Sequence, residues 1–87
     1  MAKIGGEVEQ LGQLRSSFDR QAQTVDQVAA TIRGDLGNTV WEGPAAERFR
    51  AQWTSEYEPA LRKLQAALGE CGVEVSRRRD ALVQAGS

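Results

Sequence analysis

A short stretch in the middle of the chain, Trp41-Glu42-Gly43-Pro44, lies between two long segments of helical periodicity. Gly43 can adopt the positive backbone angles that a tight turn requires, and Pro44 suits the first position of a helix, where its missing N–H costs nothing. The stretch therefore predicts a turn between two helices. Because tryptophan is a large apolar residue for an exposed bend, we expect Trp41 to fold back on nearby apolar side chains and to anchor the angle between the helices.

The first segment carries an apolar stripe. Apolar or small residues recur every three or four residues over Ile4–Leu36, interrupted once by Arg15. This spacing predicts a helix over about residues 7–35. Leu14 and Val28 lie beside the stripe and widen it, so the helix has more apolar surface than one partner helix covers. The expected ends of the helix are marked by Gly5, Gly6, Gly34, Gly37 and Asn38.

The second segment repeats the pattern and predicts a helix over about residues 44–82, after a turn over about 37–43. Pro59 removes one backbone hydrogen bond from this helix, so we expect a kink there, with two shorter helices as the alternative. Gly69 and Gly72 each cost about 1 kcal/mol relative to alanine and mark either a weak point, which we favour, or a close approach of a neighbouring backbone. The stripe consists of Ala46, Phe49, Trp53, Tyr57, Leu61, Leu64, Leu68, Cys71, Val75 and Leu82, with Arg78 or Arg79 at the step before last.

Length and pattern together predict an all-α, single-domain chain, 1–87, folded as one helix-turn-helix hairpin. A lone hairpin of this size has one apolar seam and no enclosed core, so it needs a partner for its second face. We therefore predict a helical dimer. The residues expected at the dimer interface are Leu11, Phe18, Val25, Phe49, Trp53, Leu64 and Leu68.

Composition argues against several classes of function. The 11 basic and 12 acidic residues nearly cancel, which leaves no overall field to attract nucleic acid. The chain has no histidine and one cysteine, so the usual zinc sites and histidine-based catalysis are not available. We predict no catalytic, cofactor-binding or metal-binding residue and no enzymatic activity. Cys71 is interpreted as a small buried hydrophobe, with a reactive or intermolecular disulfide role as the alternative.

The N-terminal residues lack an apolar signal-peptide region, and no stretch approaches the ~18 apolar residues of a membrane span. We expect a chain without a general secretory signal and without stable membrane insertion.

These residues resemble a known family. Trp41-Glu42-Gly43, near the middle of a chain of just under a hundred residues, is similar to the motif of the WXG family. This family comprises small, early secreted antigenic target-like proteins that type VII (ESX) secretion systems export. The similarity extends to the small and aromatic series Ala45-Ala46, Phe49 and Trp53, and to Pro59-Ala60-Leu61.

The resemblance implies a structure and a function. Family members are helical hairpins that pair antiparallel into a dimeric four-helix bundle with a related WXG-type chain or with a second copy. They are cytoplasmic before export, leave the cell folded without a cleaved signal peptide, act through protein–protein binding and are often virulence-associated. The resemblance thus implies two partners, a related WXG-type protein and the type VII secretion ATPase. It also makes Trp41 and Gly43 the turn motif, and Trp41 a candidate contact for the secretion machinery.

One departure from the family bears on the partner. Type VII substrates commonly carry a C-terminal tyrosine followed four residues later by an acidic residue. Here Asp80 is preceded at that distance by Ser76, and Tyr57 is followed by Leu61. The missing motif favours a heterodimer whose partner supplies it. The alternatives are a homodimer that uses other signals, a truncated tail, and a cytosolic helical adaptor or structural dimer that is not exported.

Overall fold

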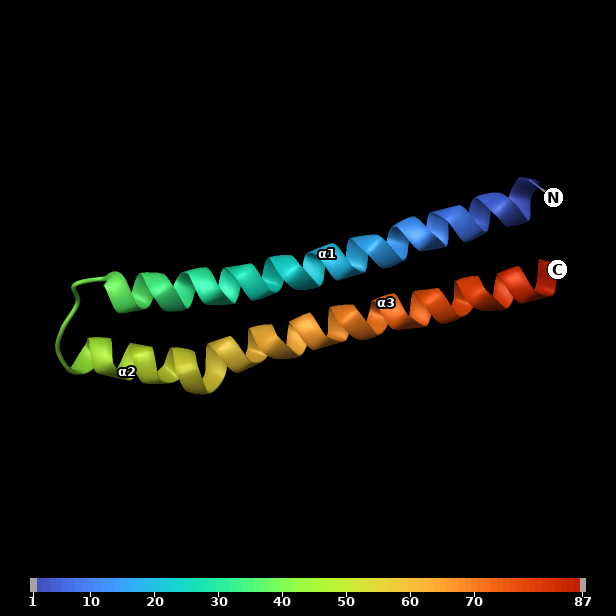
Figure 1. The fold of residues 1–87 in the computed structure, drawn as a ribbon. Helices are drawn as coiled ribbons and strands as arrows, with labels where there is room; N and C mark the ends of the chain where they lie inside the picture. Colours follow the sequence, from blue (N-terminus) through green and yellow to red (C-terminus); the bar gives the residue numbers. More distant parts are fainter. Residues whose placement is uncertain (1, 87) are drawn as a thin grey trace.

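The chain folds as an extended hairpin of two antiparallel helical arms in the computed structural model (Figure 1). The first arm is helix α1, Ala2–Asn38. The second arm comprises α2, Pro44–Gln52, a single π-helical turn, Trp53–Tyr57, and α3, Glu58–Gly86. The Cα atoms extend over 65 × 18 × 11 Å, and both ends of the chain lie at the end of the hairpin opposite the turn. The prediction of an all-α hairpin of two long antiparallel helices is confirmed.

The structure describes the backbone of residues 2–86 and the side chains of residues 6–86. Met1 and Ser87, the limits of the predicted domain, and the side chain of Ile4 lie outside the described part. No helix among the described residues is long and apolar enough to cross a membrane.

Helix α1 continues beyond the ends that its glycines predict. It passes through Gly6 without interruption, and at its other end it continues through Gly34 and Gly37 to Asn38. The low helix propensity of glycine is outweighed here by packing, because the second arm runs beside α1 along its length and reaches Gly86.

The two arms meet along an inner seam, but no large side chain in the described part of the chain is fully enclosed. Ala29 and Ala46 are the buried apolar residues, and most of the remaining seam residues are half-buried. The hairpin therefore has a stripe of packing in place of a core, as expected for a helix pair of this size. The half-buried seam residues include Val8, Leu11, Phe18, Ala22, Val25, Leu36, Trp53, Leu61, Leu68, Val75 and Leu82.

A π-helical turn lies where the sequence predicted a kink at Pro59. Pro59 has no N–H to donate to the carbonyl of Ser55, and its ring crowds that carbonyl in a regular α-helix. The wider turn Trp53–Tyr57, closed by the Glu58 N–H donating to the Trp53 carbonyl, accommodates this mismatch. The second arm therefore stays continuous past the proline (Figure 1).

The π-helical turn also keeps the apolar rows aligned. Seam residues of the second arm follow one another at intervals of seven, except for an interval of eight between Trp53 and Leu61. The wider turn takes up the additional residue, so Trp53 and Leu61 both face α1. The same adjustment places Phe49 in one row with Tyr57 and Leu64.

Ion pairs and hydrogen bonds join the arms along one side of the seam, which we call the ionic edge. The Arg62 guanidinium pairs with Asp26, and the Arg33 Nε donates to Glu58 Oε1 over 2.9 Å. Glu58 Oε1 also accepts from the Trp53 indole over 3.2 Å. The hydrogen bond from Arg33 lowers the pKa of the Glu58 carboxyl below its ordinary value. The residues of the ionic edge are Arg15, Asp19, Asp26, Arg33, Glu58, Arg62 and Ser76.

Arg15, the interruption of the first stripe, crosses the seam over Gly72. Its guanidinium donates to Asp19 on its own helix and to the Ser76 hydroxyl on α3. A Cβ atom at Gly72 would lie 3.0 Å from Arg15 Cδ and 3.2 Å from Asp19 Oδ1, whereas a Cβ atom at Gly69 would meet nothing within 4 Å. Gly72 is thus a close-approach position for a side chain, while Gly69 has no packing reason to be glycine.

The two glycines give a matched prediction. Gly69→Ala should raise the free energy of unfolding by about 1 kcal/mol, because alanine is the better helix former. The free energy of unfolding of Gly72→Ala should be lower than that of Gly69→Ala by about 1 kcal/mol or more. The reason is that Arg15 must move and its hydrogen bond to Ser76 is lost. Thermal unfolding followed by circular dichroism, at one protein concentration, measures both. Equal gains would show that Arg15 moves aside freely.

Candidate docking face and turn

One long side of the hairpin carries no charged side chain over most of its length. We call it the uncharged face. Most of its residues are exposed, with Leu14 at 44%, Val28 at 45% and Leu64 at 47% of their full accessible area. The face consists of Leu14, Ser17, Gln21, Thr24, Val28 and Thr31 on α1, and of Phe49, Tyr57, Ala60, Leu64, Ala67 and Cys71 on the second arm.

The position of each row relative to the seam places both halves of this face on one side. In an antiparallel helix pair, residues that follow a seam residue by the same number of positions lie on the same side of the pair, whichever helix they belong to. Asp26 and Arg62, each one residue after a seam residue, meet directly at the ionic edge. Leu14, Val28 and Leu64 each lie three residues after a seam residue, on the other flank of their helices. The uncharged face and the ionic edge therefore lie on opposite sides of the hairpin.

A chain of aromatic rings extends the uncharged face to the turn. The ring centroids of Tyr57 and Phe49 are 6.4 Å apart, and those of Phe49 and Trp41 are 5.8 Å apart. Trp53 joins from the seam, with its centroid 6.5 Å from that of Tyr57. Trp41, Phe49 and Tyr57 keep 40%, 38% and 44% of their areas exposed, so the second arm presents aromatic surface up to the turn.

Gly43 sets the backbone path of the turn. Its φ is 108° and its ψ is 173°, a conformation that residues with a Cβ atom rarely adopt. Pro44 occupies the first turn of α2, and the Glu47 N–H donates to the Gly43 carbonyl over 3.0 Å. Glycine followed by proline thus starts α2 abruptly, while neighbouring Val40 remains 94% exposed.

Arg50, in α2, bonds to three backbone carbonyls around the turn. Its guanidinium donates to the Leu36 carbonyl at 3.1 Å, to the Thr39 carbonyl at 3.0 Å and to the Trp41 carbonyl at 2.7 Å. Its Cζ atom lies 5.9 Å from the centroid of the Trp41 ring. One side chain therefore closes the end of α1, holds the loop and contacts the tryptophan.

The structure divides the predicted interface residues between two places. Five of them, Leu11, Phe18, Val25, Trp53 and Leu68, lie half-buried on the inner seam, where part of each side chain stays open to a partner. Phe49 and Leu64 lie on the uncharged face, and Leu64 is the more exposed of the two. Trp41 and Gly43 lie together in the turn.

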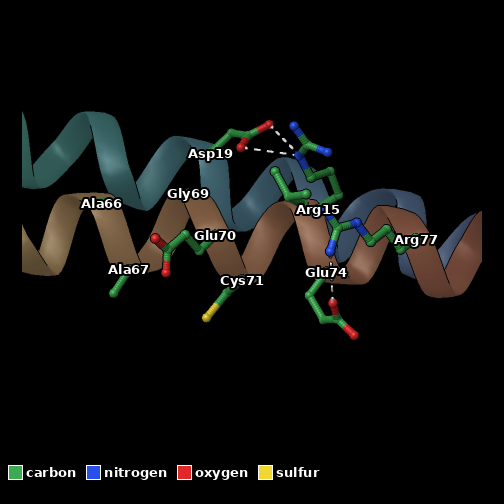
Figure 2. A pocket seen from close by; sticks show the side chains of 10 residues that line it. Arg15, Asp19, Ala66, Ala67, Gly69, Glu70, Cys71, Glu74 and Arg77 are labelled. Atoms are coloured by element: carbon green, nitrogen blue, oxygen red, sulfur yellow. Dashed lines mark hydrogen bonds and ion pairs between the residues drawn. The ribbon is translucent and has the colours of Figure 1, made fainter.

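A shallow groove runs along α3 beside the ionic edge (Figure 2). Arg15 and Asp19 reach it from α1, and Glu74 pairs with Arg77 and Arg78 on its α3 side. The Cys71 side chain points away from α1 and is exposed, in contrast to the buried position expected for it. The groove is open and most of its lining is exposed, so it offers no enclosed polar group to a ligand. The described residues contain no group of three or more possible metal ligands.

The sequence pattern missed the role of Arg50 and the distinction between seam and uncharged face. A signal for the second was present, because the aromatic residues Phe49, Trp53 and Tyr57 and then Leu61 follow at three successive steps of four. That spacing exceeds the heptad average and requires either a drift of the stripe or an additional residue in the helix. Nothing local distinguishes Arg50 from the other arginines of the second arm.

Comparison of the chain with known protein families, with curated proteins and with solved structures finds no match.

Proposed function

We propose that this protein is a non-enzymatic binding hairpin that pairs through its uncharged face with a related WXG-type hairpin. The pair forms an antiparallel four-helix bundle, which a type VII secretion system exports in the folded state. The observation that carries the proposal is the place of Trp41-Glu42-Gly43, which forms the turn of a hairpin that has one long uncharged face. A hairpin with its turn at this tripeptide is what the resemblance to the family implies, and the uncharged face supports the proposal as a surface available for pairing.

Pairing through this face is favoured by simple energetics. Fully burying an aliphatic or aromatic side chain stabilises an assembly by about 1.5–3 kcal/mol. The face offers Leu14, Val28 and Leu64 together with its aromatic residues, and its small residues allow a partner helix to approach closely. The residues of the face themselves carry no charge, so burying them avoids the penalty that a buried unpaired ion would carry. We favour a heterodimer, in which a related WXG-type chain contributes the second hairpin of the bundle.

Deletion of the partner gene in the native host tests the proposal. Without its partner, this chain should remain in the cells or be degraded as an unpaired hairpin with its apolar face exposed. Restoring the partner should restore this chain to the culture medium. Fractionation of cells and medium, followed by immunoblotting, measures both.

Two outcomes would contradict the heterodimer. Full export without any partner would favour a homodimer with its own signal. Absence from the medium even with the partner present would favour a cytosolic adaptor or structural dimer.

A further inference from the structure

We propose that Arg50 is a positioning residue that holds the turn in one shape and so presents Trp41 for recognition during export. The inference rests on the proposed function, in which the Trp41 turn is recognised by the secretion machinery. It adds a residue outside the Trp-Xaa-Gly motif on which that recognition depends.

The first observation is that no backbone–backbone hydrogen bond outside the helices involves residues 39–42 of the turn. Between the helices, residues 39–43 take part in one backbone–backbone bond, from the Glu47 N–H to the Gly43 carbonyl, and that bond belongs to the first turn of α2. The Thr39 hydroxyl donates to the Asp35 carbonyl over 2.6 Å, which completes the last turn of α1. Among the hydrogen bonds of residues 39–42, only those of Arg50 therefore connect the loop to α2 across the turn.

The second observation is the geometry of the guanidinium. It reaches the Leu36 carbonyl, at the end of α1, and the Thr39 and Trp41 carbonyls, within the loop, at the same time. A planar group with five donors in a fixed arrangement can bridge separated acceptors in this way. A lysine ammonium is a compact group on a flexible stem and cannot replace it.

The third observation is that Arg50 contacts both parts of Trp41. It binds the backbone carbonyl of Trp41 and also lies 5.9 Å from the centre of its ring, while Phe49 packs against the same ring. Loss of the guanidinium should therefore release the loop backbone and the indole together. If only a fraction of the molecules hold the turn in the shape that is recognised, the apparent affinity falls in proportion to that fraction.

The test uses Arg50→Gln and Arg50→Lys in the full chain, in the assembly that it forms. Arg48→Gln is the matched control, since Arg48 is an exposed arginine of the same helix and makes none of the bonds to the turn. We expect both Arg50 variants to keep their helix content and their assembly. The ¹⁵N heteronuclear NOE of residues 39–42 and of the Trp41 indole should fall to values typical of flexible chain. Export to the medium should fall by about tenfold, as expected if about 1.4 kcal/mol of turn preorganisation is lost.

Unchanged NOE values in Arg50→Gln would overturn the proposal, because the turn would then hold its shape without the guanidinium. Full export of a variant whose turn has become flexible would also overturn it, provided that Trp41→Ala is not exported. If Trp41→Ala itself is exported normally, recognition of the turn fails as part of the proposed function. The positioning of Trp41 by Arg50 is then still decided by the NOE values alone.

Discussion

Leu64→Glu is expected to separate the proposed dimer into single hairpins. Leu64 keeps 47% of its area exposed and lies in the uncharged face. A carboxylate there would be buried on pairing without an opposite charge among the face residues, at a penalty of about 3 kcal/mol or more. The dissociation constant should therefore rise by at least about 100-fold. Sedimentation velocity of the protein purified together with its partner, over a range of concentrations, measures the change.

Val73→Glu is the matched control for this variant. Val73 lies on the same helix and is 42% exposed, and it precedes Ser76 of the ionic edge by three residues, which places it on the ionic flank of α3. The same carboxylate should stay in water there and leave the dimer intact. If both variants dissociate to the same extent, or if neither does, the uncharged face is not the interface.

The fold follows from the sequence because its main determinants are local. The seven-residue spacing of apolar side chains specifies two helices, and Gly43-Pro44 specifies where the chain reverses. Two helices joined by a short turn have few ways to bury their stripes other than to lie antiparallel. The hairpin was therefore predictable from one sequence alone.

The exact ends of the helices depend on contacts that a local pattern does not contain. Helix α1 continues through Gly34 and Gly37, where their low helix propensity predicted an end. Its last turn is held by Arg50, fourteen residues from Leu36 in the sequence, through a side-chain bond to a backbone carbonyl. Such bonds depend on which side chain the turn brings near the helix end.

Arg15 shows why the residues of the uncharged face could not be identified from the sequence pattern. In the sequence, an arginine within an apolar stripe looks like an interruption of the packing surface. In the structure, the Arg15 side chain crosses the seam over Gly72 and donates to Ser76. This contact assigns Arg15 to the ionic edge and thereby assigns the other flank, with Leu14 and Leu64, to the uncharged face. The sequence pattern showed that the stripe was wide, but only the pairing of the arms shows which residues each flank contains.

Gly43→Ala should destabilise the turn through backbone strain. The Gly43 φ of 108° lies in a region that residues with a Cβ atom rarely adopt, and the strain of such a conformation amounts to about 1–3 kcal/mol. An added methyl group would meet no atom within 4 Å, so the whole effect comes from the backbone. We expect the midpoint of thermal unfolding, followed by circular dichroism, to fall by at least about 4–8 °C, the shift that the lower end of this range, about 1 kcal/mol, gives in a domain of this size.

Gly37→Ala is the matched control for Gly43→Ala, because it replaces a glycine that is not in a strained conformation. A Cβ atom at Gly37 also meets nothing within 4 Å, but Gly37 lies in α1 with no positive φ, so this variant should be as stable as the parent or more stable by up to about 1 kcal/mol. Trp41→Ala tests the side chain of the turn and not its backbone, because it removes a partly exposed ring and leaves the Gly43 backbone path unchanged.

The Trp41→Ala variant should keep its helix content while its export falls. If Gly43→Ala and Gly37→Ala shifted the midpoint equally, the turn would tolerate another backbone path. Trp41 would then depend on Arg50 and Phe49, and not on Gly43, for its position.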